Sequence, residues 1–281
     1  VKDHASQKRR NAIMRFFIYF FLIVITAFML LPFLWMLSSS FKENKDVFGF
    51  PIQWIPENPR WQNYVDIWTE IPLLTFIKNT AKITIVVTLL QLFTSSFAAY
   101  AFAKMQFKGK NVLFLGYIAT IAVPWQAYMV PQFMMMSSWG LNNTHLAIMC
   151  LQAFSAFGVF LMKQFYEGVP SELCEAARID GLTEYGLWWH IMLPLSLPAL
   201  STLTIFTFVN TWNDFLGPLI YLTRTELKTI QIGLRMFISQ YSAEYGLIMA
   251  ASVVVLIPVL IVFLSLQKDF CQGVASSGIK G

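Results

Sequence analysis

The sequence predicts an all-α membrane protein with six transmembrane helices. The first observation behind this fold class is composition: of 281 residues, 57% are hydrophobic and 12% charged, and the mean hydropathy is +0.58. An ordinary soluble domain is about 45–50% apolar and about 25% charged. The second is a set of six apolar runs, each long enough to cross a bilayer. The third is the gathering of basic residues at the ends of these runs. Together they exclude soluble, disordered and disulfide-scaffold proteins.

The spans follow from the need for about 20 mostly apolar residues per helix. The first run comes after a charged stretch, 1–15, which resembles the start of a signal peptide but lacks a small-residue cleavage site, so we expect a retained helix. The polar, proline-punctuated stretch 38–78 predicts an extramembrane loop with short helical pieces. The predicted spans are 16–37, 79–103, 111–135, 144–165, 197–222 and 246–266, in one transmembrane unit over 16–270.

Orientation follows from the short connections. A basic cluster precedes the first span, and Lys104, Lys108 and Lys110 lie between the second and third, whereas the connection 136–143 carries no charge. Basic residues favour the cytoplasmic side. Both termini, including the tail 271–281, are therefore predicted to lie in the cytoplasm of a prokaryote, as is the loop 167–194.

Polar side chains share faces on three spans. The second span carries Thr84, Thr88, Gln91 and Ser95 at helical spacing, which is typical of hydrogen bonding between membrane helices, worth about 0.6 kcal/mol each. The alternative, a polar lumen, stays open for all three spans. The third span places Trp125, Tyr128 and Gln132 on one face beside Gln126, and the fifth carries Asn210, Asn213 and Asp214. Two amides and a carboxylate so close together exceed what packing needs, and ionisable groups within membranes are functional candidates.

The loop 167–194 is far more polar than its surroundings and predicts a helix–turn–helix at the membrane surface. Ser171 is a suitable N-cap for a helix over 172–180, and Gly181 can supply its left-handed C-terminal residue. Thr183 can cap a second helix running toward Pro194. The small residues Ala176 and Ala177 would let a neighbouring backbone approach closely, with Glu175, Arg178 and Asp180 providing charges around them.

This loop resembles the EAA motif of ATP-binding-cassette (ABC) importer permeases. Glu175, Ala176 and Ala177 are followed at the motif's spacing by Gly181 and then by the Ile-Met-Leu-Pro run ending at Pro194. The rest of the chain is similar to the MalG-type branch of the carbohydrate uptake family. The similar segments are AFAKMQFKGKN (101–111), VPWQAYMVPQF (123–133), SSWGLNNT (137–144), NTWNDFLGPLIYL (210–222) and SSGIKG (276–281).

The resemblance implies a type I ABC importer permease fold and a role for particular residues. The segment 175–181 would be the coupling helix that docks on an ATPase subunit, and Ser277, Gly278 and Lys280 of the tail would reach the ATPase as well. The implied partners are a second, MalF-type permease, an ATPase dimer and an extracytoplasmic sugar-binding protein. The chain itself would bind no cofactor, because ATP and Mg are used by the ATPase. Residues facing the translocation path would be Gln126, Asn210, Trp212, Asn213 and Asp214.

The predicted function is that of a permease subunit of an ATP-driven importer for a carbohydrate, in particular an oligosaccharide. Sugars are neutral, rich in hydroxyls and stack on aromatic rings, which suits the aromatic and amide groups of the predicted path. The sequence has no phosphate-binding loop, no nucleophile elbow and no metal-ligand pattern, and its three cysteines lie apart. We therefore predict no catalytic, cofactor or metal site.

Three alternative functions can be compared with the same residues. An ABC permease for another small solute, such as an amino acid or a phosphonate, would share the EAA motif. An ion-coupled secondary transporter would need buried ionisable groups near the midplane or repeated broken helices, and only Asp214 is a candidate. An intramembrane enzyme would need a catalytic set at membrane depth, and the sequence offers none.

Overall fold

The computed structural model describes the backbone of residues 2–238 and 243–278, and the side chains of 11, 13–238 and 243–271. The regular secondary structure of the described residues is helical, apart from an isolated antiparallel bridge between Ile238 and Ala243. The chain divides into two compact units, one of residues up to 71 with 236–254 and the other of 72–235 with the residues from 255 on. The helix α14 (Tyr245–Gly278) passes from the first unit into the second.

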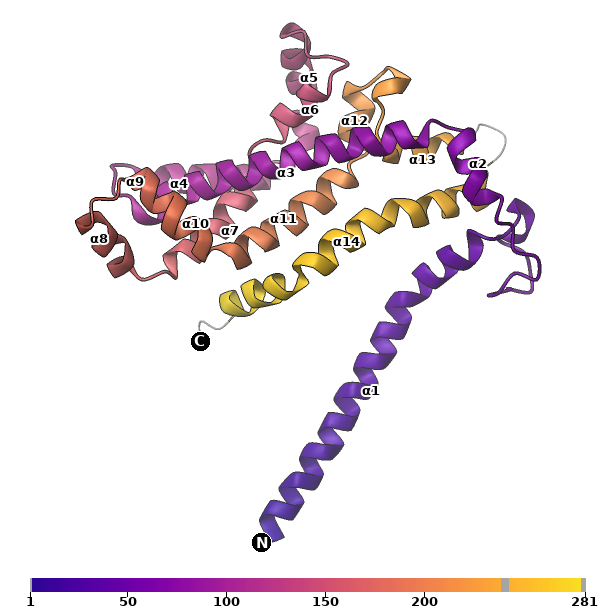
Figure 1. Cartoon of the computed structure of the whole chain (residues 1–281), viewed down its shortest axis with the longest axis horizontal. Coiled ribbons are helices and arrows are strands. Elements are labelled where there is room, and N and C mark those ends of the chain that lie inside the picture. Colours follow the sequence, from indigo (N-terminus) through magenta and orange to yellow (C-terminus); the bar gives the residue numbers. More distant parts are fainter. Residues whose placement is uncertain (1, 239–242, 279–281) are drawn as a thin grey trace. The chain divides into compact units, whose positions relative to one another are not determined.

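In the first unit, α1 (Lys2–Ser39) is longer than the predicted span, because the charged N-terminal stretch continues the same helix (Figure 1). Its apolar portion is exposed on every side from Ile13 to Leu34. A helix that is hydrophobic all round is typical of a membrane span. The window Ile13–Ser39 is indeed long and apolar enough to cross a bilayer.

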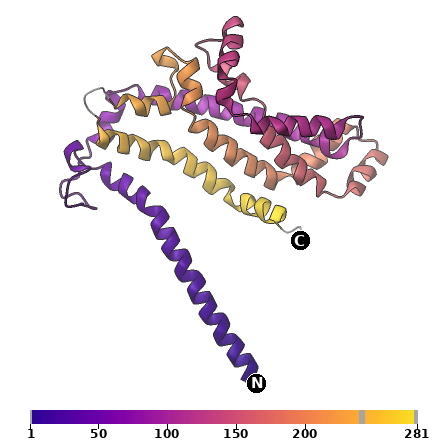
Figure 2. The ribbon, with the colours of Figure 1, turned by 180° about the vertical axis from the view of Figure 1, so that it is seen from behind.

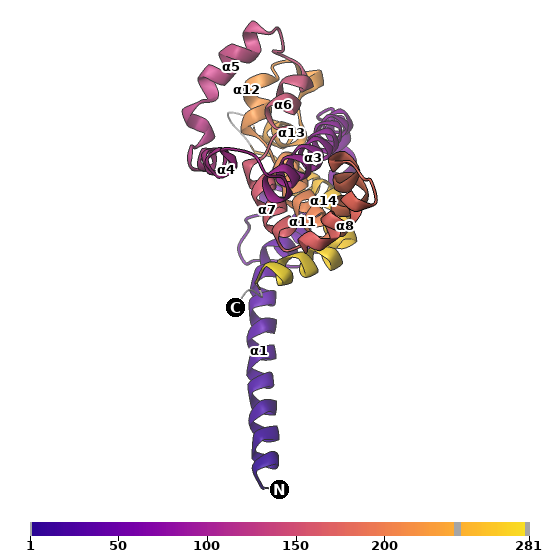
Figure 3. The same ribbon diagram turned by 90° about the vertical axis from the view of Figure 1, so that its left-hand side faces the viewer.

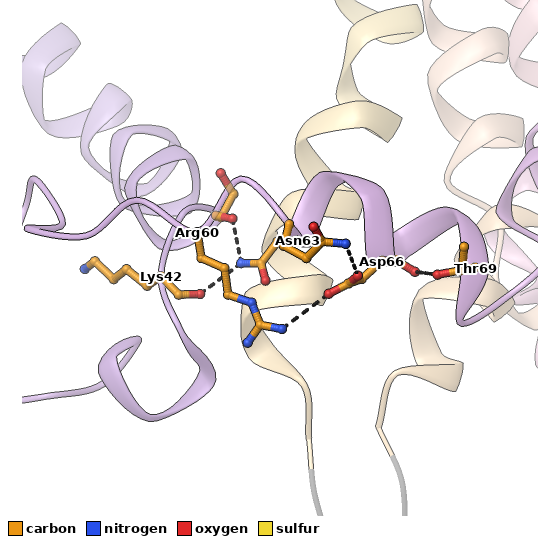
Figure 4. A network of polar contacts seen from close by, with 7 residues as sticks. Lys42, Arg60, Asn63, Asp66 and Thr69 are labelled. Atoms are coloured by element: carbon orange, nitrogen blue, oxygen red, sulfur yellow. Dashed lines mark hydrogen bonds and ion pairs between the residues drawn. The ribbon is translucent and has the colours of Figure 1, made fainter.

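The loop that follows α1 is closed by one buried amide. Asn63, at the start of α2 (Asn63–Thr69), donates from Nδ2 to the carbonyl oxygens of Ser40 and Lys42, each over 2.9 Å (Figure 4). Its side chain is 2% exposed, so these bonds lie away from competing water. Arg60, which precedes α2, forms an ion pair with Asp66 of α2 at 3.3 Å. The stretch after α1 contains short helical pieces, as expected, and is a folded element, whereas its extramembrane location stays a prediction.

The second unit is built on α3 (Leu73–Lys104), α7 (Ala156–Glu167) and α11 (Leu197–Trp212), which pack side by side (Figures 1 and 2). The buried face of α3 includes Thr84, Thr88 and Ser95, so the polar stripe of this span faces protein. Gly158 makes the close packing feasible: a Cβ there would overlap the Ser95 hydroxyl and lie 3.2 Å from a Leu203 methyl.

The third predicted span, 111–135, is not one helix, and this expectation was wrong. It consists of α4 (Lys110–Ala119), the 3₁₀ turns Thr120–Ala122 and Trp125–Ala127, and α5 (Met129–Ser138). Figure 3 shows α4 and α5 running in different directions. The break falls at Pro124, which lacks an N–H and pushes the residue before it out of the helical region. Val123 is accordingly extended, with φ −85° and ψ 112°.

The fourth and fifth predicted spans are also interrupted. Over 144–165, α6 (His145–Leu151) and α7 meet at 42°, because Ser155 caps α7 by accepting from the Gly158 N–H. Over 197–222, α11 ends at Trp212 and α12 (Leu216–Tyr221) follows after three residues.

The remaining elements are short. Three described helices are long and apolar enough to span a membrane. Up to five spans result if two bent pairs each count as one, namely α6 with α7 and the stretch Glu184–Leu195 with α11, which meet at 79°. The shorter apolar stretch Lys110–Ala122 lies outside that count. The short elements are α8 (Ser171–Ile179), α9 (Glu184–Leu187), the π-helix Trp188–Met192, α10 (Leu193–Leu195), α13 (Ile230–Met236) and the 3₁₀ turns Asn44–Asp46 and Thr225–Leu227.

Candidate functional site

The structure offers two candidate sites in the second unit, a polar cavity and the surface of the loop 167–194. The cavity has a volume of about 620 Å³ and lies where the interrupted helices meet. Five of the eight residues predicted to face a translocation path line this cavity: Trp125, Tyr128, Gln132, Asn210 and Asp214.

The helix breaks place hydrogen-bonding groups around this cavity. Gln152, at the end of α6, donates from Nε2 to Asp214 Oδ2 over 2.8 Å and accepts from the Thr211 hydroxyl over 3.3 Å. The other carboxylate oxygen of Asp214 accepts from the Gly217 N–H over 3.1 Å and so caps the start of α12. The two breaks are therefore tied to each other through Gln152 and Asp214.

The α3 helix supplies the groups that satisfy the broken backbone. Gln91 donates to the carbonyl of Gln152 over 2.7 Å, and Thr94 donates to the carbonyl of Ala153 over 2.9 Å. Thr207 in turn donates to Gln91 Oε1 over 2.9 Å. Carbonyls released from a membrane helix need such partners, because hydrocarbon offers none.

Aromatic groups form another part of the wall. The indole of Trp125 donates to Gln132 Oε1 over 2.8 Å, which fixes its ring at the cavity. Tyr128 and Tyr221 also line it, as do Phe154, Phe157 and Phe206. The wall therefore combines amides, hydroxyls, aromatic faces and a single carboxylate, Asp214.

The other three predicted path residues point elsewhere. Trp212 is 2% exposed and donates from its indole to the carbonyl of Val255 on α14 over 3.1 Å. Asn213 accepts from Gln231 and donates to the carbonyl of Val209. Gln126 is exposed and outside the cavity lining.

Several lining residues were missed from the sequence. The most important is Gln152, and its signal was available: it is an amide in the middle of an otherwise apolar run, three residues before Ser155. Gln91 was noted only as part of the polar stripe of the second span. No group of three or more His, Cys, Asp or Glu in the described part of the chain is placed to hold a metal ion.

The loop 167–194 folds as the expected helix–turn–helix. The helix α8 starts at Ser171, with Pro170 rather than Ser171 as its N-cap, and Gly181 ends it with φ +85°. The N–H groups of Gly181 and Leu182 bond the carbonyls of Arg178 and Ala177, each over 3.0 Å, which is the Schellman motif. Thr183 caps α9 by accepting from the Gly186 N–H, as predicted.

One face of α8 is buried. Cys174 and Ala177 pack in a cluster with Leu187, Trp188 and Met192, and the Cys174 sulfur lies 3.8 Å from that of Met192. Ala176 is exposed, whereas Ala177 is only 6% exposed. The expectation that both alanines lie on one free face was therefore wrong.

The centre of this cluster is Trp188, which is fully buried. Its ring stands edge-to-face against Phe93 and Phe97 of α3, at centroid distances of 5.6 and 5.3 Å. The helix–turn–helix is thereby packed against the C-terminal half of α3.

A polar contact joins the same elements. Arg178 donates to both carboxylate oxygens of Glu184, over 2.7 and 3.3 Å, and the Tyr100 hydroxyl of α3 donates to the same carboxylate. The hydrogen bond from Arg178 lowers the pKa of Glu184, and the carboxylate in turn raises the pKa of Arg178. Arg178 is thus engaged within the loop itself.

The outward face of the loop is mixed in character. Glu175 and Asp180 are exposed beside Ile179, whose side chain is 87% exposed, and Gly181 and Pro194 are exposed as well. This face therefore offers both charged and apolar side chains to solvent. Ser277 and Gly278 belong to α14, but their side chains, like the whole of Lys280, lie outside the described residues.

Comparisons with known proteins agree with this picture. Residues 91–272 match the family described as binding-protein-dependent transport system inner membrane component. The chain is 35% identical over 253 residues to the arabinooligosaccharides transport system permease protein AraQ of Halalkalibacterium halodurans, which covers 89% of this chain and 91% of that protein. It is 32% identical to the lactose transport system permease protein LacG of Rhizobium radiobacter, over 88% of this chain and 89% of that protein.

The fold is also similar to a chain in the crystal structure of a bacterial ABC transporter involved in the import of the acidic polysaccharide alginate. The TM-score is 0.80 at 24% identity, covering 91% of this chain and 97% of that chain. The family match includes both the cavity residues from Gln91 on and the whole loop 167–194. The chain belongs to the family of binding-protein-dependent transport system inner membrane components, and it is a multi-pass permease subunit of an ABC transporter rather than an enzyme.

Proposed function

We propose that this permease carries a carbohydrate, in particular an oligosaccharide, into the cytoplasm of a prokaryote at the expense of ATP hydrolysed by a separate subunit. The observation that carries the proposal is the cavity wall, which combines neutral amides and hydroxyls with aromatic rings. Sugars offer hydroxyls to the former and apolar ring faces to the latter. The relatives named for arabinooligosaccharides and lactose support this substrate class.

The single carboxylate of the wall is consistent with a neutral substrate. Both oxygens of Asp214 already accept hydrogen bonds, from Gln152 and from the Gly217 backbone. Among the residues that the structure describes, no lysine or arginine that would attract an anionic solute lines the cavity. For a charged solute, a wall with opposing charges would be the better design.

We infer six membrane crossings with both termini in the cytoplasm. Helices α1, α3 and α14 would cross unbroken, α6 with α7 would form one interrupted crossing, and α11 with α12 another. The sixth would be α4 with α5, on either side of the break at Pro124. The lysines at 104, 108 and 110 support the cytoplasmic placement of the α3–α4 connection.

The exposed face of α8 would dock on the ATPase subunit. Glu175, Asp180 and Ile179 supply polar and apolar contacts, whereas Arg178 and Ala177 hold α8 to the rest of the chain. Movement of the ATPase would be passed to α3 through Trp188 and Tyr100. The tail residues Ser277, Gly278 and Lys280 would add a second ATPase contact.

The complete importer would contain a second, MalF-type permease, an ATPase dimer that uses ATP and Mg, and an extracytoplasmic sugar-binding protein, all at the cytoplasmic membrane. A solved alginate transporter in complex with its pentasaccharide-bound periplasmic protein, similar to this chain with a TM-score of 0.63, supports the last partner.

The test is ATPase activity of the reconstituted importer with its binding protein, measured across a panel of neutral oligosaccharides and of amino acids. Stimulation by a saccharide, together with ATP-dependent uptake of it, is the expected result. Stimulation by amino acids alone would overturn the carbohydrate assignment. The control is Gly181→Asp, because a side chain at φ +85° is strained and would displace α8; it should abolish stimulation while leaving membrane insertion unchanged.

A further inference from the structure

The segment 47–56, between α1 and α2, exposes apolar side chains that the transport function does not use. The segment carries no charged residue. Its exposed side chains are Phe48 at 64%, Phe50 at 94%, Ile52 at 56%, Trp54 at 47% and Ile55 at 85%. Contiguous apolar exposure of this kind marks a surface that something other than water covers.

The position of the segment is fixed against the end of α1. The Trp54 ring packs edge-to-face on Trp35 at 5.5 Å, and its carbonyl accepts from the Ser38 hydroxyl over 2.5 Å. Trp35 and Ser38 belong to the last turns of the apolar window Ile13–Ser39. Trp54 therefore lies at the depth where α1 leaves the hydrocarbon.

The base of the segment is held firmly. Asn63 closes the loop through its two bonds to Ser40 and Lys42 (Figure 4). On the other side, Phe48 packs edge-to-face on Tyr245 at 4.8 Å. The apolar side chains are thus presented from a fixed support, so their exposure is not the result of a loose loop.

We propose that the segment 47–56 is an interfacial anchor that inserts Phe50, Ile52, Trp54 and Ile55 into the lipid headgroup region at the C-terminal end of α1. Tryptophan is enriched at this depth. The backbone here is irregular, so its polar groups need water, which the headgroup region retains and the hydrocarbon core lacks. The proposal depends on α1 crossing the bilayer and not on the nature of the substrate.

Local charges indicate which lipid surface the anchor fits. Residues 42–60 contain three basic and three acidic side chains. Lys45 pairs with Glu43 at 2.9 Å, Arg60 pairs with Asp66 at 3.3 Å, and Lys42 lies over the Trp35 ring at 4.3 Å. Since the cations are locally engaged, the anchor acts through apolar contact and is indifferent to lipid charge.

The test is spin-label accessibility in the assembled importer, reconstituted into nanodiscs of phosphatidylcholine and of phosphatidylcholine with phosphatidylglycerol. Labels are placed by Phe50→Cys and by Ile55→Cys, with Glu57→Cys in the same loop as the matched control. Cys150 and Cys271 are replaced by serine, whereas Cys174 is buried and stays. Uptake by each variant verifies assembly.

We expect the labels at 50 and 55 to collide more with dissolved oxygen than with a water-soluble nickel complex, the label at 57 to show the reverse, and both nanodisc types to agree. High nickel accessibility at 50 and 55 would overturn the proposal. So would exclusion of both reagents, because that result means a protein partner covers the segment. If the labels at 50 and 55 favour oxygen over nickel only in nanodiscs with phosphatidylglycerol, electrostatic attraction holds the segment at the membrane and the proposed apolar insertion is wrong.

Discussion

The side chain of Trp188 connects the loop 167–194 to α3, and replacing it by alanine should separate ATP hydrolysis from transport. The indole is fully buried and contacts both Phe93 and Phe97. Removing a buried tryptophan costs about 3–5 kcal/mol. The exposed Arg178–Glu184 pair contributes only about 0.2–1 kcal/mol and cannot offset that loss. The equilibrium constant for detachment of α8 from α3 should therefore rise by a factor on the order of 10²–10³.

The assay is the reconstituted importer, in which uptake and ATP turnover are measured together. Trp188→Ala should lose uptake and lose stimulation by the loaded binding protein, and proteases should cut between α8 and α9 more rapidly. Trp188→Phe keeps a ring against α3 and should retain most coupling. The neighbouring Trp189 is 50% exposed, so Trp189→Ala serves as the matched control and should behave like the unmodified protein.

Two results would refute this reasoning. Normal coupling in Trp188→Ala would show that the loop reaches α3 by another route. Equal damage from Trp189→Ala would show that the loop responds to any loss of an aromatic side chain, and not to the buried contact.

Three further predictions concern the ion pair, the close helix contact and the cavity. Glu184→Gln should speed amide hydrogen exchange in α8 about 1.4-fold to fivefold at pH 7. In the unmodified protein the same acceleration should appear only at acid pH. The lowered pKa of Glu184 keeps its carboxylate ionised, and the stabilisation by the ion pair intact, above about pH 4.3. Gly158→Ala should lower stability by about 1–3 kcal/mol, measured by thermal unfolding in detergent, and Ser95→Gly in the same chain should recover part of it. Asp214→Ala should reduce uptake severely, because it leaves the Gln152 amide and a backbone N–H without an acceptor, at about 1–3 kcal/mol each. Asp214→Asn keeps one acceptor for the two donors and should transport better than the Ala variant; an Asn variant as inactive as the Ala variant would contradict this account.

Much of the loop 167–194 could be predicted from the sequence because its signals are local. A left-handed glycine and a threonine cap act within a few residues of themselves, and Gly181 and Thr183 occupy these roles in the structure. Which alanine faces inward could not be predicted, because Ala177 is buried by residues from other elements, Trp188 among them.

The interrupted spans show the opposite case. Hydropathy measures only how apolar a stretch is, so it joined α6 with α7 and α11 with α12 into continuous helices. The break after Leu151 is stabilised by Gln91 and Thr94, which lie about 60 positions away in the sequence. The break at Pro124 had a local signal, and the length of the apolar run concealed it. Trp212 lies away from the cavity because its indole donates a hydrogen bond to the carbonyl of Val255 on α14. The spacing of residues within one span cannot reveal such a partner.

If the cavity is the translocation path, as proposed, the mutual hydrogen bonding of Gln152, Thr211 and Asp214 bears on how long a cargo molecule would stay there. A hydroxyl of the cargo must replace a hydrogen bond that the wall residues already make with one another. Each new contact therefore adds little net binding free energy. A wall of this kind gives a shallow energy profile, on which a solute is guided without being trapped. Residence would then be short, and selection of the cargo would rest with the proposed binding protein, which holds the cargo before entry.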